Sequence, residues 1–254
     1  MKLAGLSIFV VAIFLIVGCE KDYYPIANGK LLQKIVYRWH DTLSYSFLKY
    51  DQNDRLVEMK GTGINSPLDT SIVSIDYDAQ GKMIGYIYKD NRLPNVYAYT
   101  FIYNSDGRIS EKRTSGSNTR SHTYTYDEKG RLVADSLYIH DLNSMIPVVL
   151  YQYDDADNLI KWQNFYYNPS TRKIDSLPGN EASYHNSRNT LVDIGQTLHF
   201  ILEYRAYILS KHNVAQVKNN GDTHTYTYEY YANGLTKKVI HNNDKAFYEE
   251  FFYD

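Results

Sequence analysis

The sequence predicts an all-β fold: an antiparallel meander of long hairpins that forms a soluble wide sheet or barrel. Three observations carry this prediction. A short turn motif that begins with tyrosine recurs along the chain at intervals of 27, 26, 23 and 27 residues. The residues around each turn alternate between two faces, which is the periodicity of a strand. Tyrosine, a residue enriched in strands, accounts for 27 of the 254 residues.

The first eighteen residues are typical of a signal peptide. Met1-Lys2 is a short basic start, and residues 3–18 are almost wholly apolar. This run is shorter than the roughly 20 residues that a spanning helix needs, but it suits the apolar region of a signal peptide. Ile16-Val17-Gly18-Cys19 resembles a bacterial lipobox, in which cleavage precedes a cysteine that is then lipidated. The alternative is a plain transmembrane anchor, but Cys19 is the only cysteine and ends the apolar run.

These features divide the chain into a signal peptide (1–18), a lipidated Cys19 with its linker (19–29) and a single β-repeat domain (30–254). Glu20 and the Lys21-Asp22 pair resemble sorting signals of outer-membrane and surface-exported lipoproteins of Bacteroidetes, although a polar linker without special meaning accounts for them equally well. The expected partner is therefore a membrane, bound through the lipid on Cys19. The expected location is the outer membrane, with the fold at the cell surface; the periplasmic face is the alternative.

The repeated motif explains the hairpins. Tyrosine ends a strand, an Asp or Asn then starts a turn, and the fourth residue after the tyrosine takes the positive φ that closes it. A basic and an aliphatic residue open the return strand. Repeated over residues 30–254, the motif predicts roughly sixteen strands. Five copies begin at Tyr50, Tyr77, Tyr103, Tyr126 and Tyr153, and degenerate copies begin at Tyr184 and Tyr230.

One segment breaks this pattern. Between residues 189 and 203, Leu191, Ile194, Leu198 and Ile201 recur at helical spacing, with Asn189 or Thr190 as a cap. The segment is apolar on more than one side. We therefore expect a short buried helix, or a plug that closes one end of the sheet.

The copies of Tyr-Asp-x-x-Gly-Arg-Leu resemble the tyrosine-aspartate (YD, or RHS-like) repeat. Together with the lipobox, they make the chain similar to Bacteroidetes outer-membrane lipoproteins of unknown function that have a porin-like fold. The resemblance covers residues 30–254 and implies a barrel, but it supplies no catalytic residues. Between Arg108 and Arg113, charged residues occupy both faces of the strand. A lipid-facing strand needs one apolar face, so we expect a tethered soluble barrel rather than a membrane-spanning one.

No catalytic, cofactor or metal motif stands out, and we expect a protein that is not an enzyme and uses no cofactor and no metal. The eight histidines lack ligand spacing; a meeting of His122 and His224 across strands is conceivable, but packing beside tyrosines is the simpler interpretation. Carboxylates at turns leave a glycosidase-like pair open, although none is singled out. The net charge of −2 argues against nucleic acid as a partner.

Rows of tyrosines are the one functional hint. If adjacent hairpins are in register, their rings would stack on glycans or peptides; the favoured alternative is that they form the packed inner face of the sheet. The hypothesis is a non-enzymatic binding or structural module for glycans or host proteins. The alternative is a periplasm-facing carrier or envelope assembly factor that holds an apolar ligand in its barrel, with residues 189–202 as a lid. The candidate stacking residues are Tyr97, Tyr99, Tyr124, Tyr126, Tyr226 and Tyr228.

Overall fold

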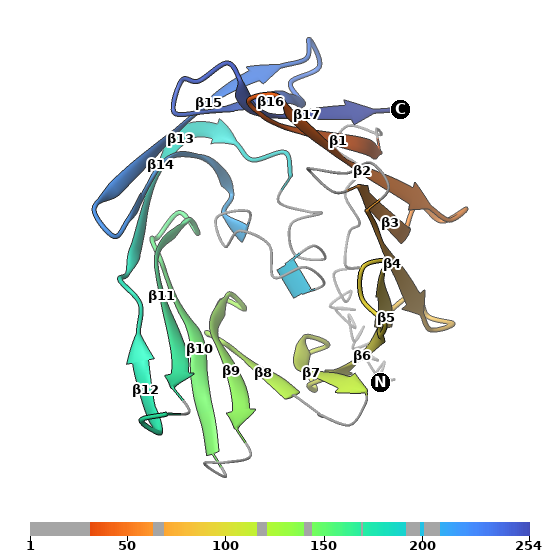
Figure 1. Cartoon of the computed structure of the whole chain (residues 1–254), viewed down its shortest axis with the longest axis vertical. Coiled ribbons are helices and arrows are strands. Elements are labelled where there is room, and N and C mark those ends of the chain that lie inside the picture. The colour runs from red at the N-terminus through yellow and green to blue at the C-terminus, as the bar shows by residue number, and fades with distance from the viewer. Residues whose placement is uncertain are drawn as a thin grey trace, which may run out of the picture.

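The computed structural model describes residues 31–62, 69–115, 121–139, 144–168, 170–191, 199–200 and 209–254. It confirms the all-β prediction: consecutive strands pair antiparallel, except that β11 pairs with both β12 and β13, and β17 returns to pair with β1, so the sheet closes into a barrel (Figure 1). The strands are β1 (Leu32–Trp39), β2 (Thr42–Tyr50), β3 (Leu56–Thr62), β4 (Thr70–Tyr77), β5 (Met83–Asp90), β6 (Val96–Tyr103), β7 (Ile109–Ser115), β8 (Ser121–Tyr126), β9 (Leu132–Ile139), β10 (Ser144–Tyr153), β11 (Leu159–Asn168), β12 (Lys173–Ser176), β13 (Asn180–Arg188), β14 (His212–Asn219), β15 (Asp222–Tyr230), β16 (Thr236–His241) and β17 (Phe247–Tyr253).

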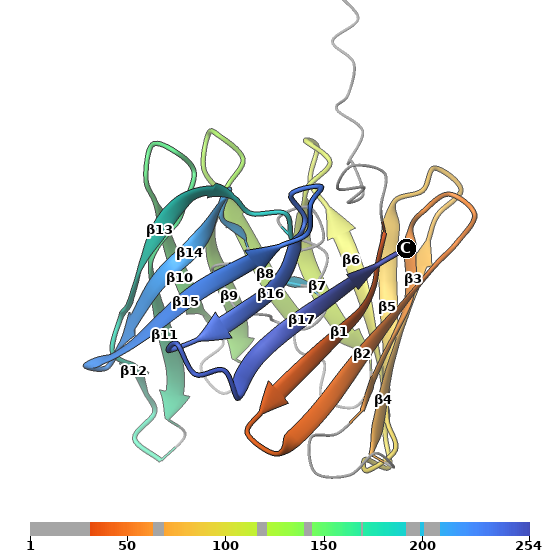
Figure 2. The same ribbon diagram turned by 90° about the horizontal axis from the view of Figure 1, so that it is seen from above.

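The wall has sixteen strand positions, because β12 and β13 share the position beside β11. β11 pairs with β13 at Lys161 and Trp162, and farther along with β12 at residues 165–168. Leu177, Pro178 and Gly179 separate β12 from β13, and Pro178 has no N–H to donate to a ladder. The predicted strand number is thus confirmed. Figure 2 shows the wall from the side, with β17 beside β1.

The turns after β2, β4, β6, β8, β10 and β15 share one geometry. The first residue after the strand donates its N–H to the carbonyl four residues later at 2.9–3.0 Å, and its own carbonyl accepts the N–H three residues later at 2.9–3.2 Å. A β-bulge follows each turn directly. The predicted position of positive φ is confirmed in all six, at Asp54, Gly81, Gly107, Gly130, Asp157 and Gly234.

Neighbouring repeats are connected through the tyrosine that ends each outgoing strand. Its hydroxyl donates to the main-chain carbonyl of the aliphatic residue that opens the preceding return strand. Tyr77 reaches Leu56 in this way at 2.9 Å. The basic residue of the preceding repeat lies over the same ring, as Arg55 does over Tyr77, 4.8 Å from the centroid. The same hydroxyl contact recurs at Tyr50, Tyr103, Tyr126 and Tyr184.

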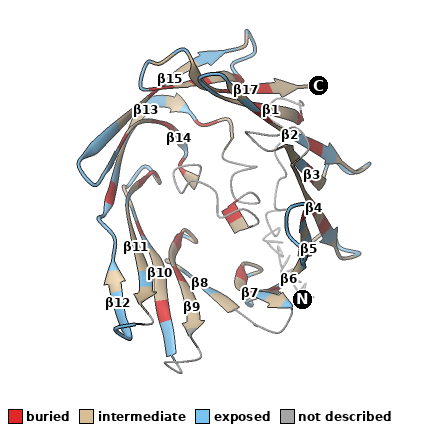
Figure 3. Ribbon diagram, viewed as in Figure 1, coloured by how far each residue is buried: buried red, intermediate tan, exposed pale blue. Residues whose placement is uncertain are grey.

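The core lines the inside of the barrel, because alternate residues of every strand point inward. Figure 3 shows buried positions distributed around the whole ring. Leu56, Ile109 and Leu159, which open return strands, are all buried. Aromatic rings continue the core toward the opposite end of the barrel. Tyr86 stacks on Tyr99 with ring centroids 4.3 Å apart.

The connection from β13 to β14 supplies residues to the barrel interior. We call residues 190–210 the insertion; 190–191, 199–200 and 209–210 are described. The ring of Phe200 contacts Phe101 on β6 and Tyr124 on β8, at centroid distances of 6.5 and 5.0 Å. The side chain of Ser210 accepts the N–H of Leu159 at 2.9 Å. The described part of the insertion therefore packs inside the wall, as the plug prediction requires.

The helix predicted near 189–203 is described only in part. Residues 199–200 have helical conformation, and residues 192–198 and 201–203 lie outside the described residues. Asn189, the predicted cap, lies directly before the insertion, where the two ends of the insertion come together. Its N–H donates to the carbonyl of Lys211 at 2.8 Å, its side-chain Nδ2 donates to the carbonyl of Ser210 at 2.9 Å, and its Oδ1 accepts the N–H of Leu191 at 3.0 Å. Asn189 thus holds the two ends of the insertion together.

Candidate functional site

The six tyrosines predicted from the sequence lie on the inner face of the barrel wall. Tyr124 and Tyr226 are buried in the core. Tyr99, Tyr126 and Tyr228 are partly buried and pack against the core. This placement agrees with the packed-inner-face interpretation, and their role in stacking on a ligand stays a prediction.

These tyrosines do not form one continuous row. Tyr97 lies 6.4 Å from Tyr88, whereas Tyr124 faces Phe200 of the insertion. Burial raises the pKa of Tyr228 well above its ordinary value, and the nearby Glu249 carboxylate raises it further. The rings are therefore engaged by several parts of the wall and by the insertion.

Two histidine–carboxylate pairs also face inward, one part-buried and one buried. His122 Nδ1 lies 2.8 Å from an oxygen of Asp135, and His241 Nε2 lies 3.1 Å from an oxygen of Glu249. His122 and His224 do not meet, because β8 pairs with β7 and β9 while β15 pairs with β14 and β16. No group of three or more metal-ligating side chains is found within the described residues. Across the same residues, no helix has the length and apolar character needed to cross a bilayer.

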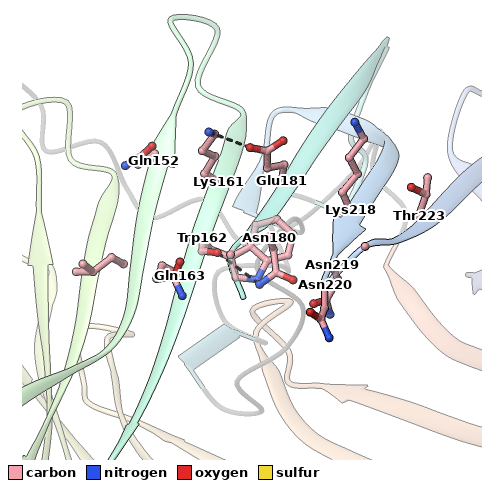
Figure 4. Close-up of a pocket in the computed structure, with 13 residues that line it drawn as sticks. Gln152, Lys161, Trp162, Gln163, Asn180, Glu181, Lys218, Asn219, Asn220 and Thr223 are labelled. Atoms are coloured by element: carbon pink, nitrogen blue, oxygen red, sulfur yellow. Dashed lines mark hydrogen bonds and ion pairs between the residues drawn. The ribbon is translucent and has the colours of Figure 1, made fainter. Parts of the chain in front are cut away.

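A hollow lies on the wall where the position beside β11 changes from β13 to β12. We call it the seam groove; it has a volume of about 650 Å³ and extends from β10 across to β15 (Figure 4). Only two register pairs, Lys161 with Glu181 and Trp162 with Asn180, join β11 to β13. Trp162 and Asn180 lie together in Figure 4, but Trp162 pairs with the core residue Tyr151 and therefore faces the barrel interior, whereas Gln163 pairs with exposed Leu150 and faces outward. Asn180 is buried, whereas Trp162 is half-buried and also packs against the core.

One ion pair stands at the rim of the seam groove. Lys161 Nζ lies 2.9 Å from Glu181 Oε1, and both side chains are about half exposed (53% and 54%). The hydrogen bond from Lys161 lowers the pKa of Glu181, and the charge of Lys218 lowers it further. The groove rim therefore carries one carboxylate between two ammonium groups. Amides from several strands complete the lining: Gln152, Gln163, Asn180, Asn219 and Asn220.

Sequence reasoning missed the seam groove. Its residues come from strands that are far apart in the chain, and Trp162 lies where the turn motif is weakest. The only local signal was Pro178-Gly179, a break between two strand-like runs. Cys19, the signal peptide and the linker lie outside the described residues. The lipid attachment is consequently a prediction from sequence alone.

Comparisons with known proteins identify the fold. Neither the scan against protein-family models nor the search of curated proteins found a match. Among solved structures, a porin-like protein from Bacteroides uniformis is similar, with a TM-score of 0.59 and 14% identity, over 88% of this chain and 98% of that one. A porin-like protein from Bacteroides vulgatus matches over the same shares with 10% identity and a TM-score of 0.42, and a TcdB2-TccC3 chain matches over 10% of its length with a TM-score of 0.33. This chain therefore shares the barrel fold of the B. uniformis porin-like protein.

Proposed function

We propose that this chain is a lipid-anchored lipoprotein of the outer membrane whose barrel is a non-enzymatic binding module at the cell surface. The proposed location and lipid anchor rest on the lipobox-like sequence that ends at Cys19. Leu31, the first described residue, hydrogen-bonds with Asp254 after β17. Since β17 ends where β2 and β4 end, this contact lies at the barrel end that carries the repeat turns. A tether through Cys19 would therefore hold this end toward the membrane.

The charges on the outer wall support a barrel that stands in water rather than in lipid. Glu111 and Arg113 form an outward ion pair on β7, and Arg113 is 55% exposed. Lys161 and Glu181 form another across β11 and β13. Lysine or arginine in the middle of a lipid-facing strand costs about 2–4 kcal/mol each. A barrel with such a wall is better accommodated outside the bilayer.

The described insertion side chains inside the barrel are the observation that carries the binding proposal. His199 and Phe200 of the insertion contact rings on β6, β8 and β10, and Ser210 bonds to β11 and β13. These side chains occupy space that a carrier would need for an apolar ligand. The outer wall, with its seam groove, is then the surface for a partner. Among the described residues that line the groove, Glu181 is the one carboxylate, which favours binding over two-carboxylate glycoside hydrolysis.

Protease shaving of intact cells tests the proposed surface location and membrane attachment. The wild type and a Cys19→Ala variant are treated with protease before and after the outer membrane is opened. We expect the wild type to be digested on intact cells and the variant to be lost from the outer-membrane fraction. Protection of the wild type until the membrane is opened would contradict surface exposure and favour the periplasm-facing carrier or assembly role. Unchanged membrane attachment of Cys19→Ala would contradict the lipid anchor.

A further inference from the structure

Strand alternation places an apolar row on the outer face of the wall at β2. Leu48 belongs to the core and points inward, so its neighbour Phe47 points outward. Lys34 of β1 pairs with both Phe47 and Phe252, and the next residue, Ile35, belongs to the core. Lys34 and Phe252 therefore share the outer face with Phe47. Figure 1 shows β17, β1 and β2 side by side in the wall. We call one group of their outward side chains the anchor-side patch: Lys34, Leu43, Tyr45, Phe47 and Phe252.

The anchor-side patch exposes apolar surface around one lysine. The side chain of Phe47 is 45% exposed and that of Leu43 is 38% exposed. Tyr45 stacks on Phe47 with ring centroids 6.2 Å apart. Lys34 Nζ lies 5.6 Å from the ring centroid of Tyr45 and 4.7 Å from that of Phe252. Tyrosine and lysine combine an apolar body with a polar tip, which suits the boundary between lipid chains and water.

The wall around the patch is basic. Along the described strands β17, β1, β2 and β3, the outward charged residues are four bases and two acids: Lys34, Arg38, Lys49, Lys60, Glu58 and Glu250. The whole chain, by contrast, carries a net charge of −2. A local excess of lysine and arginine attracts anionic lipid headgroups within about a Debye length. Across the barrel, β8 instead presents Thr123 and Thr125 outward, on either side of the core residue Tyr124.

The position of the predicted anchor brings a bilayer to this part of the wall. Leu31 directly precedes β1, and Cys19 lies twelve residues before Leu31. A chain of that length spans at most about 40 Å even when it is fully extended. Lipid on Cys19 would therefore keep the membrane surface within reach of β1 and its neighbours at a high effective concentration.

We infer that the anchor-side patch contacts the headgroup layer of the membrane that holds the lipid anchor. The inference rests on the proposed anchor at Cys19 and adds the surface through which the folded barrel meets the bilayer. The rings of Tyr45, Phe47 and Phe252 enter the headgroup layer, and Lys49 and Lys60 bond to lipid phosphates beside them. The seam groove then faces away from the membrane, because β10 and β11 lie across the barrel from β2 and β3 (Figure 1).

A second copy of the chain fits the patch less well than a membrane does. A symmetric dimer buries the same surface on both copies, so the basic side chains around one patch would face those around the other. Like charges that meet across an interface repel each other. Anionic headgroups pair with the same side chains and also receive the exposed rings.

A fluorescent label on the patch can test this contact in the lipidated protein. Cys19 is the only cysteine, and lipidation consumes its thiol, so a new cysteine is the single labelling position. Phe47→Cys carries an environment-sensitive label, and Thr125→Cys, exposed on β8, is the matched control. Each protein is reconstituted into vesicles of phosphatidylcholine and phosphatidylglycerol in equal parts. We expect headgroup spin-labelled lipid to quench the label at position 47 at least about twofold more than the label at position 125.

Charge reversal then tests the basic wall. Lys60 is exposed on β3, next to Phe47, and Lys173 is exposed on β12. With the label at position 47, we expect Lys60→Glu to lower the ratio of membrane-bound to free patch about tenfold. Lys173→Glu should leave the quenching unchanged, and the thermal unfolding transition should be the same in both variants.

Flotation of the same vesicles separates this contact from the anchor. Protein that floats with the vesicles but shows equal quenching at positions 47 and 125 would overturn the inference and leave the anchor intact. A blue-shifted label at position 47 that the spin-labelled lipid does not quench would also overturn it, because a protein surface would then cover the patch. Protein that does not float would contradict the lipid anchor, and the inference with it.

Discussion

Leu31 and Asp254 hydrogen-bond to each other in both directions across 223 residues of sequence. The N–H of Leu31 donates to Asp254 Oδ1 at 2.8 Å, and the N–H of Asp254 donates to the carbonyl of Leu31 at 3.1 Å. Asp51 and Arg55 form the same two bonds within a single repeat turn. The barrel is therefore closed by a repeat motif whose two halves come from opposite ends of the described chain.

Replacement of Asp254 should weaken this closure. Asp254→Ala removes an acceptor from the part-buried N–H of Leu31, and we expect the free energy of unfolding to fall by about 1–2 kcal/mol. Denaturant unfolding measures the loss. Asp41→Ala, in the exposed turn between β1 and β2, is the matched control and should change stability by less than about 0.5 kcal/mol. Equal effects of the two substitutions would contradict closure through Asp254.

The tyrosine hydroxyls that connect neighbouring repeats should contribute individually to stability. Tyr77→Phe keeps the ring but deprives the Leu56 carbonyl of its donor. We expect a loss of about 1 kcal/mol in the free energy of unfolding. Tyr166→Phe on β11 alters a side chain that is 45% exposed and should be close to neutral. A Tyr77→Phe protein as stable as the wild type would show that the hydroxyl contact adds nothing to stability.

Alanine substitutions at two glycines with the same φ angle can distinguish the cost of backbone strain from the cost of a lost contact between repeats. Gly107 and Gly130 both have a φ of 82°, so alanine at either should cost about 1 kcal/mol. At Gly107 a Cβ would meet nothing within 4 Å, whereas at Gly130 it would overlap the guanidinium of Arg108. Arg108 would then have to leave the ring of Tyr126, which lies 5.7 Å away. We expect Gly130→Ala to be less stable than Gly107→Ala by about 0.5–1 kcal/mol; equal losses in chemical denaturation would argue against this contact.

The buried tyrosines predict a loss of stability at alkaline pH. Burial raises the pKa of Tyr253 from 10 to about 12, and burial likewise raises the pKa of Tyr50, Tyr126 and Tyr153 well above 10. Above pH 10 the folded protein therefore binds more protons at these phenols than the unfolded chain does. Their contribution is complete below pH 10, and the free energy of unfolding should fall as the pH rises from 10 through 12.

Two measurements made together check this pH dependence. Denaturant unfolding at a series of alkaline pH values gives the stability, and ultraviolet absorbance follows tyrosinate formation. Ionisation of the buried phenols should coincide with loss of the strand signal in circular dichroism. Full ionisation near pH 10 with the strands intact would contradict their burial.

Much of the fold could be predicted because the repeat is local. A tyrosine, an Asp or Asn and a residue that tolerates positive φ specify each turn within six residues, and Asp54 and Asp157 show that aspartate can replace glycine there. The strand number and the all-β class follow from repetition of that unit. The six tyrosines could be selected by alternation, since Tyr97 and Tyr99, for example, point to the same face.

The site was not predictable, because it depends on which strands become neighbours. The alternation of Tyr124 and Tyr126 shows that they share a face, but Phe200 of the insertion makes that face an interior. Trp162 and Asn180 become partners only because β13 lies beside the first part of β11 and β12 beside the second, with the Pro178-Gly179 break between them.

The sequence by itself determined the hairpin unit and its number of repeats, since both are written in short stretches of neighbouring residues; the membrane anchor at Cys19 is a prediction from the same kind of local signal. The tertiary structure alone decided three things: that the sheet closes where β17 pairs with β1 and Asp254 bonds to Leu31, that the described part of the insertion packs inside, and that a polar groove opens at the seam. The physical reason is that hydrogen bonds within a turn act over a few residues, whereas closure, filling and the seam depend on contacts between segments up to 223 residues apart.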